Sequence, residues 1–145
     1  MKGSLIIITS PSGGGKGTLI REVLATVSEI TYSVSYTTRP MRPGEEDGRE
    51  YFFISREEFE DRQAKGEFLE SATVHGNLYG TSRSQIEKVT DSGKDVILEI
   101  DVQGANIILA KEPDIVSVFI LPPSFPVLSE RLKKRATESP QEIEL

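Results

Sequence analysis

The sequence contains no cysteine and a single histidine, His75. Without cysteine, the chain has no disulfide, no thiol nucleophile and no thiolate metal ligand. A lone histidine also excludes metal sites that need two imidazole ligands. We expect His75 to lie at an exposed strand end and assign it no functional role. Any chemistry must therefore depend on carboxylates, amines, guanidinium groups, hydroxyls and the backbone.

The chain also lacks an excess of positive charge and any long apolar run. Its 145 residues include 17 Lys and Arg against 23 Asp and Glu, which gives a formal net charge of −6. This acidic balance argues against nucleic acid as a partner. No apolar run approaches the roughly 20 residues of a membrane-spanning helix, and Leu5–Ile8 is too short for a secretory signal. We therefore predict a cytoplasmic protein with no membrane partner, whose oligomeric state the sequence does not indicate.

The hydrophobic pattern predicts an α/β fold built on a parallel sheet. A β-branched strand over Leu5–Thr9 precedes a glycine-rich loop and then a helix over Thr18–Val27. The same alternation returns after residue 92, and we expect a sheet with helices on both faces. The later expected segments are the strand Val96–Ile100, the helix Gln103–Lys111, the strand Ile115–Leu121 and the helix Ser124–Arg135.

From residue 33 to residue 92 the sequence has short apolar segments separated by turn-forming residues. This pattern predicts an inserted region of mixed strands and helices. Turn-rich segments separate three expected strands, Ser33–Tyr36, Tyr51–Ile54 and Phe68–Val74. Ser55 and Ser82 each begin a capping box, in which an acid or amide three residues later completes the cap of a helix. We expect the two short helices that follow to end at Gly66 and Gly93.

The residues after the first strand predict a phosphate-binding loop. Glycines let backbone N–H groups surround an anion, and the N-terminus of the following helix adds partial positive charge. Lys16 is placed to reach the β- and γ-phosphates of a nucleotide. Gly17 stands where such loops usually carry the hydroxyl that binds Mg²⁺, so phosphates and water would hold most of the metal's coordination. The alternative is a glycine-rich turn in an unrelated α/β protein.

Two arginines mark the beginning of the inserted region. Arg39 and Arg42 each precede a proline, which favours extended backbone at both positions. Two guanidinium groups on a stiff loop can bind one phosphate through forked hydrogen bonds. Taken alone, this pattern leaves open a surface loop with solvated arginines.

Five segments read together resemble guanylate kinases. They are SPSGGGKGT, SVSYTTRPMRPGEEDGREYFF, GEFLESATVHGNLYGT, LEIDVQGA and LSERLKKRATES, and they span nearly the whole chain. The resemblance implies transfer of the γ-phosphoryl group of ATP to GMP with Mg²⁺, on a P-loop NTPase core that carries an inserted GMP-binding subdomain. On this basis we expect the core at residues 1–32 and 93–135, the GMP-binding subdomain at 33–92, and the beginning of a lid at 136–145.

The resemblance also implies roles for individual side chains. Glu70 matches the residue that reads guanine, because one carboxylate can accept from both N1–H and N2–H₂, and adenine offers neither donor. The other positions that match GMP ligands are Ser35, Arg39, Arg42, Tyr51, Tyr79, Thr81 and Asp101. The catalytic matches are Lys16, Arg39, Arg131 and Arg135. The expected ATP ligands are Ser10, Pro11, Ser12, Gly13, Gly14, Gly15, Lys16, Gly17 and Thr18.

Each of these positions has an ordinary alternative when it is taken singly. The two tyrosines could be core aromatics with a solvated hydroxyl, and Glu70 and Thr81 could be polar residues on a strand face. Arg131 and Arg135 lie four apart on one expected helix face, which could also be a solvated basic face.

Two acids end the predicted strand before the last helices. Glu99 and Asp101 lie two apart, so their side chains share one side of the strand. An acid at the end of a buried strand near a phosphate loop assists Mg²⁺, often through water. The resemblance places Glu99 nearer to the metal and Asp101 nearer to GMP.

Guanylate kinases usually continue beyond the point where this sequence stops, with the rest of the lid, a final strand and a C-terminal helix. We expect a fragment that binds GMP better than ATP and turns over poorly. Two other functions stay open: a kinase for another nucleoside monophosphate, and a guanylate-kinase-like module that binds phosphorylated peptides without catalysis. The intact lysine and glycines of the loop favour an enzyme over the second.

Overall fold

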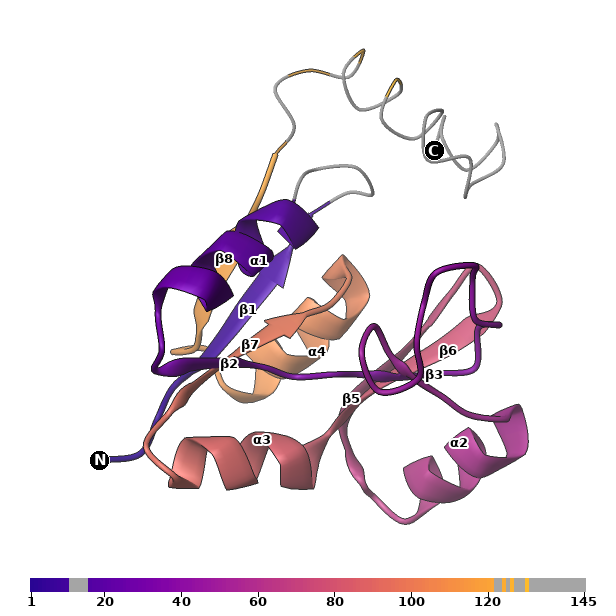
Figure 1. Ribbon diagram of the computed structural model, residues 1–145. Coiled ribbons are helices and arrows are strands. Elements are labelled where there is room, and N and C mark those ends of the chain that lie inside the picture. The colour runs from indigo at the N-terminus through magenta and orange to yellow at the C-terminus, as the bar shows by residue number, and fades with distance from the viewer. Residues whose placement is uncertain (11–15, 122–123, 125, 127–129, 131–145) are drawn as a thin grey trace.

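The computed structural model describes residues 1–10, 16–121, 124, 126 and 130, and contains two four-stranded sheets. Sheet A has the strand order β2-β7-β1-β8 (Figure 1). Its strands are β1 (Leu5–Thr9), β2 (Ile30–Tyr32), β7 (Asp95–Glu99) and β8 (Val116–Phe119). All three pairings within sheet A are parallel, which confirms the prediction made from the alternating pattern.

Helices cover both faces of sheet A, as predicted. Helix α1 (Lys16–Thr26) packs against Ile8 on one face, and α4 (Val102–Lys111) packs against Ile7 on the other. Neighbouring residues of a strand point to opposite faces, so these two isoleucines enter separate cores. Burial on both faces explains why β1 is apolar without interruption.

Sheet B lies beside the core and has the strand order β4-β3-β6-β5 (Figure 1). Its strands are β3 (Tyr36–Thr37), β4 (Phe52–Phe53), β5 (Phe68–Val74) and β6 (Asn77–Ser82). The β3–β4 pairing is parallel and the other two are antiparallel, so the sheet is mixed, as expected. Helix α2 (Arg56–Ala64) buries Phe59 completely, and its ring lies 4.6 Å from that of Phe68, centroid to centroid.

The two predicted capping boxes both begin helices. Ser55 Oγ accepts from the N–H of Glu58 at the start of α2, and Ser82 Oγ accepts from the N–H of Gln85 at the start of α3 (Arg83–Asp91). Beyond the helix ends, Gly66 and Gly93 have φ of 71° and 89°. Glycine adopts this left-handed conformation without penalty, which is why both helices stop where the sequence predicts.

The strand predicted at Ser33–Tyr36 is wrong. The segment connects the two sheets: β2 ends at Tyr32, and β3 begins at Tyr36. The Ser33 N–H donates to the Ile97 carbonyl in sheet A, whereas the Ser35 carbonyl accepts from the Phe52 N–H in sheet B, each at 2.9 Å. A change of partner sheet within three residues does not alter hydrophobic alternation, so the pattern could not reveal it.

Strand β6 is absent from the sequence prediction. It follows a tight turn in which His75 and Gly76 have φ of 49° and 80°, as in the type I′ turn that joins antiparallel strands. Val74 pairs with Asn77 across this turn. His75 is exposed, as expected, but it lies in the turn itself. Residues 77–82 include Asn77, Gly80 and Ser82, which favour turns over strands, and this composition is why the strand was missed.

The remaining expected elements are present with shifted ends. Helix α1 begins at Lys16, two residues early, β7 is displaced by one residue, and β4 and β8 are shorter than expected. Of the expected helix Ser124–Arg135, Pro126 and Glu130 are described and are helical, and most of the rest lies outside the described residues. The helices within the described ranges include none with the length and apolar character needed to span a membrane.

Candidate active site

Sheet B and the carboxyl end of β7 together form a pocket. It is lined by Ser35, Tyr51, Glu70, Val74, Tyr79, Gly80, Glu99, Ile100 and Asp101. Six of these residues are site residues predicted from the sequence, and they come from segments as far apart as residues 35 and 101. Val74, Gly80 and Ile100 were not predicted. The fold therefore brings the six predicted site residues, which are distant in the sequence, together around one pocket.

Glu70 is the buried acid of this pocket. It is 5% exposed, and its Oε1 accepts a hydrogen bond of 2.6 Å from the Thr81 hydroxyl, which is fully buried. Burial raises the pKa of Glu70 to about 7, and the negative charge of Asp101 adds to the rise, against the opposing effect of the Thr81 hydrogen bond. Thr81 does not line the pocket and acts on it by holding Glu70. A ligand with paired N–H donors would favour the ionised form of this carboxyl group.

Asp101 has a structural role that the sequence analysis missed. Its Oδ1 accepts from the N–H of Gly104 at 3.1 Å and its Oδ2 from the N–H of Gln103 at 3.3 Å. It is thus the N-cap of α4 as well as a lining residue of the pocket. A capping aspartate satisfies backbone donors and suits the positive end of the helix.

Two tyrosines of the pocket contact each other, and one of them lies beside Arg39. The rings of Tyr51 and Tyr79 meet edge to face with centroids 5.7 Å apart, and both line the pocket. Burial, followed by the negative charge of Glu99, raises the pKa of Tyr51 to about 12. The hydroxyl therefore stays protonated at neutral pH and can donate a hydrogen bond to an anion. The Arg39 guanidinium carbon lies 5.3 Å from the centroid of the Tyr51 ring.

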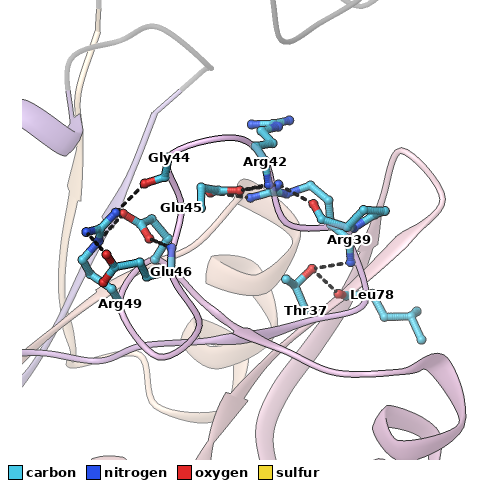
Figure 2. A network of polar contacts seen from close by, with 10 residues as sticks. Thr37, Arg39, Arg42, Gly44, Glu45, Glu46, Arg49 and Leu78 are labelled. Atoms are coloured by element: carbon cyan, nitrogen blue, oxygen red, sulfur yellow. Dashed lines mark hydrogen bonds and ion pairs between the residues drawn. The ribbon is translucent and has the colours of Figure 1, made fainter.

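Arg39 is held by a carboxylate that the sequence analysis did not single out, Glu45 (Figure 2). Its Nη1 and Nη2 donate to the two oxygens of Glu45, each at 2.9 Å, and Arg39 as a whole is 8% exposed. These hydrogen bonds raise the pKa of Arg39 and lower the pKa of Glu45. The backbone N–H of Arg42 also donates to Glu45, whereas the Arg42 side chain extends away from it (Figure 2). Glu45 therefore fixes the orientation of Arg39 and leaves the Arg42 side chain projecting from the loop. The available signal was an acid three residues after the second arginine.

Glu99 lies at the carboxyl end of sheet A. It pairs in register with Ile8 of β1, the strand that leads into the predicted phosphate loop. The Tyr32 hydroxyl, which the sequence analysis did not single out, donates to Glu99 Oε2 at 3.0 Å. Burial raises the pKa of Tyr32, so this hydroxyl remains a donor.

The described residues contain no group of three or more His, Cys, Asp or Glu side chains that could enclose a metal ion. A single carboxylate such as Glu99 is nevertheless compatible with Mg²⁺, which commonly keeps several waters and uses one or two carboxylates together with substrate phosphates. The donor set therefore fits a magnesium ion held largely by nucleotide and water.

Several predicted residues lie outside the described part of the chain. These are residues 11–15 of the loop, the Lys16 side chain, Arg131, Arg135 and the segment 136–145. At the edges of the loop, Ser10 is buried after β1, and Gly17 and Thr18 lie exposed in the first turn of α1. A strand that ends at Thr9 and a helix that begins at Lys16, on either side of the loop residues, are the setting that the phosphate-loop prediction requires.

Comparisons with known proteins agree with this arrangement. The family model described as guanylate kinase matches residues 2–145. A guanylate kinase of Symbiobacterium thermophilum is 56% identical over 142 residues, covering 98% of this chain and 67% of the relative. One from Thermotoga maritima is 52% identical, covering 99% of this chain and 69% of the relative. The crystal structure of guanylate kinase from Anaplasma phagocytophilum superposes with a TM-score of 0.80 at 39% identity, covering 99% of this chain and 71% of that one.

Proposed function

This chain belongs to the guanylate kinase family, and we propose that it transfers the γ-phosphoryl group of ATP to GMP, giving ADP and GDP. The observation that carries the proposal is the pocket in which the buried carboxyl group of Glu70 and the hydroxyls of Tyr51 and Tyr79 line one hollow. A nucleoside monophosphate needs such an arrangement, because its base and its phosphate present different donors and acceptors at opposite ends.

Guanine recognition depends on Glu70. In its ionised form, the Glu70 carboxylate accepts hydrogen bonds from N1–H and N2–H₂ of guanine. The Thr81 hydroxyl donates to Glu70 Oε1 and so fixes the orientation of the carboxylate. Ser35 and Asp101 line the same pocket and provide further polar contacts for the base. Adenine would leave the carboxylate without its partners, which is the basis of selectivity.

The GMP phosphate binds at the other end of the pocket. Arg39, Arg42, Tyr51 and Tyr79 are its proposed ligands, and the first is already oriented by Glu45. A phosphate monoester has its second pKa near 6, so the attacking oxygen is largely ionised at neutral pH and no general base is needed.

Transfer then requires positioning and charge neutralisation. Lys16 and the loop around it bind the ATP phosphates, and Arg131 and Arg135 offset charge on the transferring group. Glu99 would hold Mg²⁺ through water, and the ion would neutralise charge on the β- and γ-oxygens. The cytoplasmic location, the absence of nucleic-acid and membrane partners, and the domain boundaries stay predictions.

A coupled ADP-release assay with GMP, AMP, CMP and UMP tests the function. We expect release with GMP far above that with the other three monophosphates. Calorimetry with GMP alone provides a second measure that does not depend on the ATP site. Equal heats with GMP and AMP would contradict the proposal.

Glu45→Gln is expected to weaken GMP binding about tenfold. The change keeps the shape of the side chain but removes the charge that holds Nη1 and Nη2 of Arg39, so the arginine must be ordered when the phosphate binds. Titration calorimetry with GMP measures the effect.

Glu46→Gln is the matched control, because Glu46 is exposed and pairs with the exposed Arg49 in the same loop. It should leave the affinity unchanged. Tighter GMP binding in Glu45→Gln would mean that Glu45 competes with the phosphate for Arg39, and our interpretation of this contact would be wrong.

A further inference from the structure

The two parts of the pocket meet at a glycine. Gly104 lies in the first turn of α4, in the core, and is buried against Glu70 of sheet B. A Cβ atom on Gly104 would lie 2.6 Å from Glu70 Oε2 and 3.1 Å from its Cδ. It would also lie 3.3 Å from Asp101 Oδ1, the oxygen that accepts from the Gly104 N–H. Gly104 therefore lies close to two of the carboxylates that line the pocket, those of Glu70 and Asp101.

Backbone conformation does not explain the glycine. Gly104 is helical and is not among the glycines with positive φ, such as Gly66 and Gly93, which end helices. Alanine is the better helix former at a position with ordinary helical geometry. What alanine cannot do is share the space of the Glu70 carboxylate.

The carboxylate has little freedom to move aside. Thr81 holds Oε1 at 2.6 Å, and Glu70 is almost fully buried. Oε2 occupies the space beside Gly104. The open direction for a displaced carboxylate is the pocket that Glu70 lines, where the proposed function places the base.

We infer that Gly104 is a specificity-determining positioning residue, whose missing side chain lets Glu70 lie against α4 at the position from which it reads guanine. The inference rests on the proposed function, because it concerns the base that the site selects. It assigns discrimination between bases jointly to the core helix α4 and to strand β5.

The test compares Gly104→Ala with the unaltered chain by calorimetry, using GMP and IMP, which lacks the 2-amino group. Gly104→Ala should weaken GMP binding by at least tenfold and IMP binding by less, because a misplaced carboxylate loses two hydrogen bonds to guanine and one to hypoxanthine. Asn106→Ala is the control: it is an exposed substitution on the same helix that also favours helix formation. It should leave both affinities unchanged.

A second pair of variants separates the clash from a general effect on folding. Gly104→Ala should lower Tm when Glu70 is present and raise it in a Glu70→Ala background, where the space is free. This reversal of sign isolates the contact between the two residues, and it can be measured even if the single variant binds no nucleotide.

Two outcomes would overturn the inference: an unchanged ratio of GMP to IMP affinity in Gly104→Ala, or the same change in Tm in both backgrounds. Failure of the unaltered chain to bind GMP would instead reject the proposed function, and the Tm comparison would still test the contact.

Discussion

Glu70→Gln is expected to reduce GMP affinity about 100-fold and to abolish the preference for GMP over IMP. Glutamine keeps the volume of the side chain, but it offers one acceptor and presents an amide donor to the N–H groups of guanine. Hydrogen bonds to a charged acceptor contribute roughly 1.5–3 kcal/mol each. Losing one of the two bonds to guanine and weakening the other therefore accounts for a loss of affinity of about 100-fold. Calorimetry with both nucleotides measures it.

The same residue predicts how GMP binding depends on pH. With a pKa of about 7 in the free protein, Glu70 is mostly protonated at pH 6 and mostly ionised at pH 8. Because guanine binds the ionised form, affinity should rise about tenfold over this interval, and a proton should be released on binding. Titration of the GMP phosphate adds its own dependence. In Glu70→Gln, only the pH dependence due to the GMP phosphate should remain.

The stability of the fold should fall as the pH rises, whereas GMP affinity increases. The pKa of Glu70 is raised from 4.5 to about 7 by folding, so its favourable contribution is complete below pH 4.5 and is lost as the pH rises through 7. The difference corresponds to roughly 3 kcal/mol. Glu70→Gln should therefore raise Tm at pH 8 and change it little at pH 4.

Glu67→Gln provides the control for both measurements. Glu67 is exposed, lies three residues before Glu70 and pairs with Arg62 at 3.1 Å on the surface. It should alter neither nucleotide affinity nor the pH dependence of Tm. An unchanged GMP affinity in Glu70→Gln would remove this residue from the site.

Arg39→Met should also weaken GMP binding by about 100-fold, through the phosphate. Methionine retains much of the packing against the Tyr51 and Phe53 rings but has no donors. The substitution also removes the cation from the carboxylate of Glu45 and leaves it only the Arg42 N–H as a donor, so we expect a loss of about 2 kcal/mol in the free energy of unfolding. Urea denaturation and GMP calorimetry measure the two effects.

The two effects of Arg39→Met can be separated. Arg39→Met combined with Glu45→Met should recover most of the lost stability, since a buried pair replaced by apolar side chains is often neutral. GMP binding should stay weak in this double variant. Arg49→Met, which removes an exposed arginine of the same loop, should affect neither property. Recovery of binding in the double variant would show that Arg39 is structural only.

The sequence was most informative where local chemistry determines structure. Capping serines and terminal glycines placed α2 and α3 correctly, because the cap and the left-handed residue are properties of a few neighbouring positions. The uninterrupted apolar run of β1 predicted a strand buried on both faces for the same reason. The family resemblance supplied the pocket residues, six of which the fold gathers around one hollow.

What the sequence could not provide are relations between distant segments. The change of sheet after Tyr32 depends on partners near residues 52 and 97, and neither alters the local pattern. Likewise, nothing near Tyr32 indicates a hydrogen bond to Glu99, and nothing near Gly104 indicates contact with Glu70. Glu45 is the exception, since it lies six residues from Arg39 and its charge made it a reasonable candidate partner.

The two ends of the pocket are built in different ways. The proposed phosphate ligands Arg39, Arg42, Tyr51 and Tyr79 all come from sheet B and the loop between β3 and β4, so phosphate binding does not require packing against α4. Discrimination between bases requires β5 to pack against α4. Glu70 lies in β5, whereas its neighbours Asp101 and Gly104 lie at the N-terminus of α4. Mild denaturant should first loosen the packing of β5 against α4. We then expect the protein to lose its preference for guanine while it still binds nucleotides. Fidelity is then the more fragile property, and its loss would be the earliest sign of unfolding.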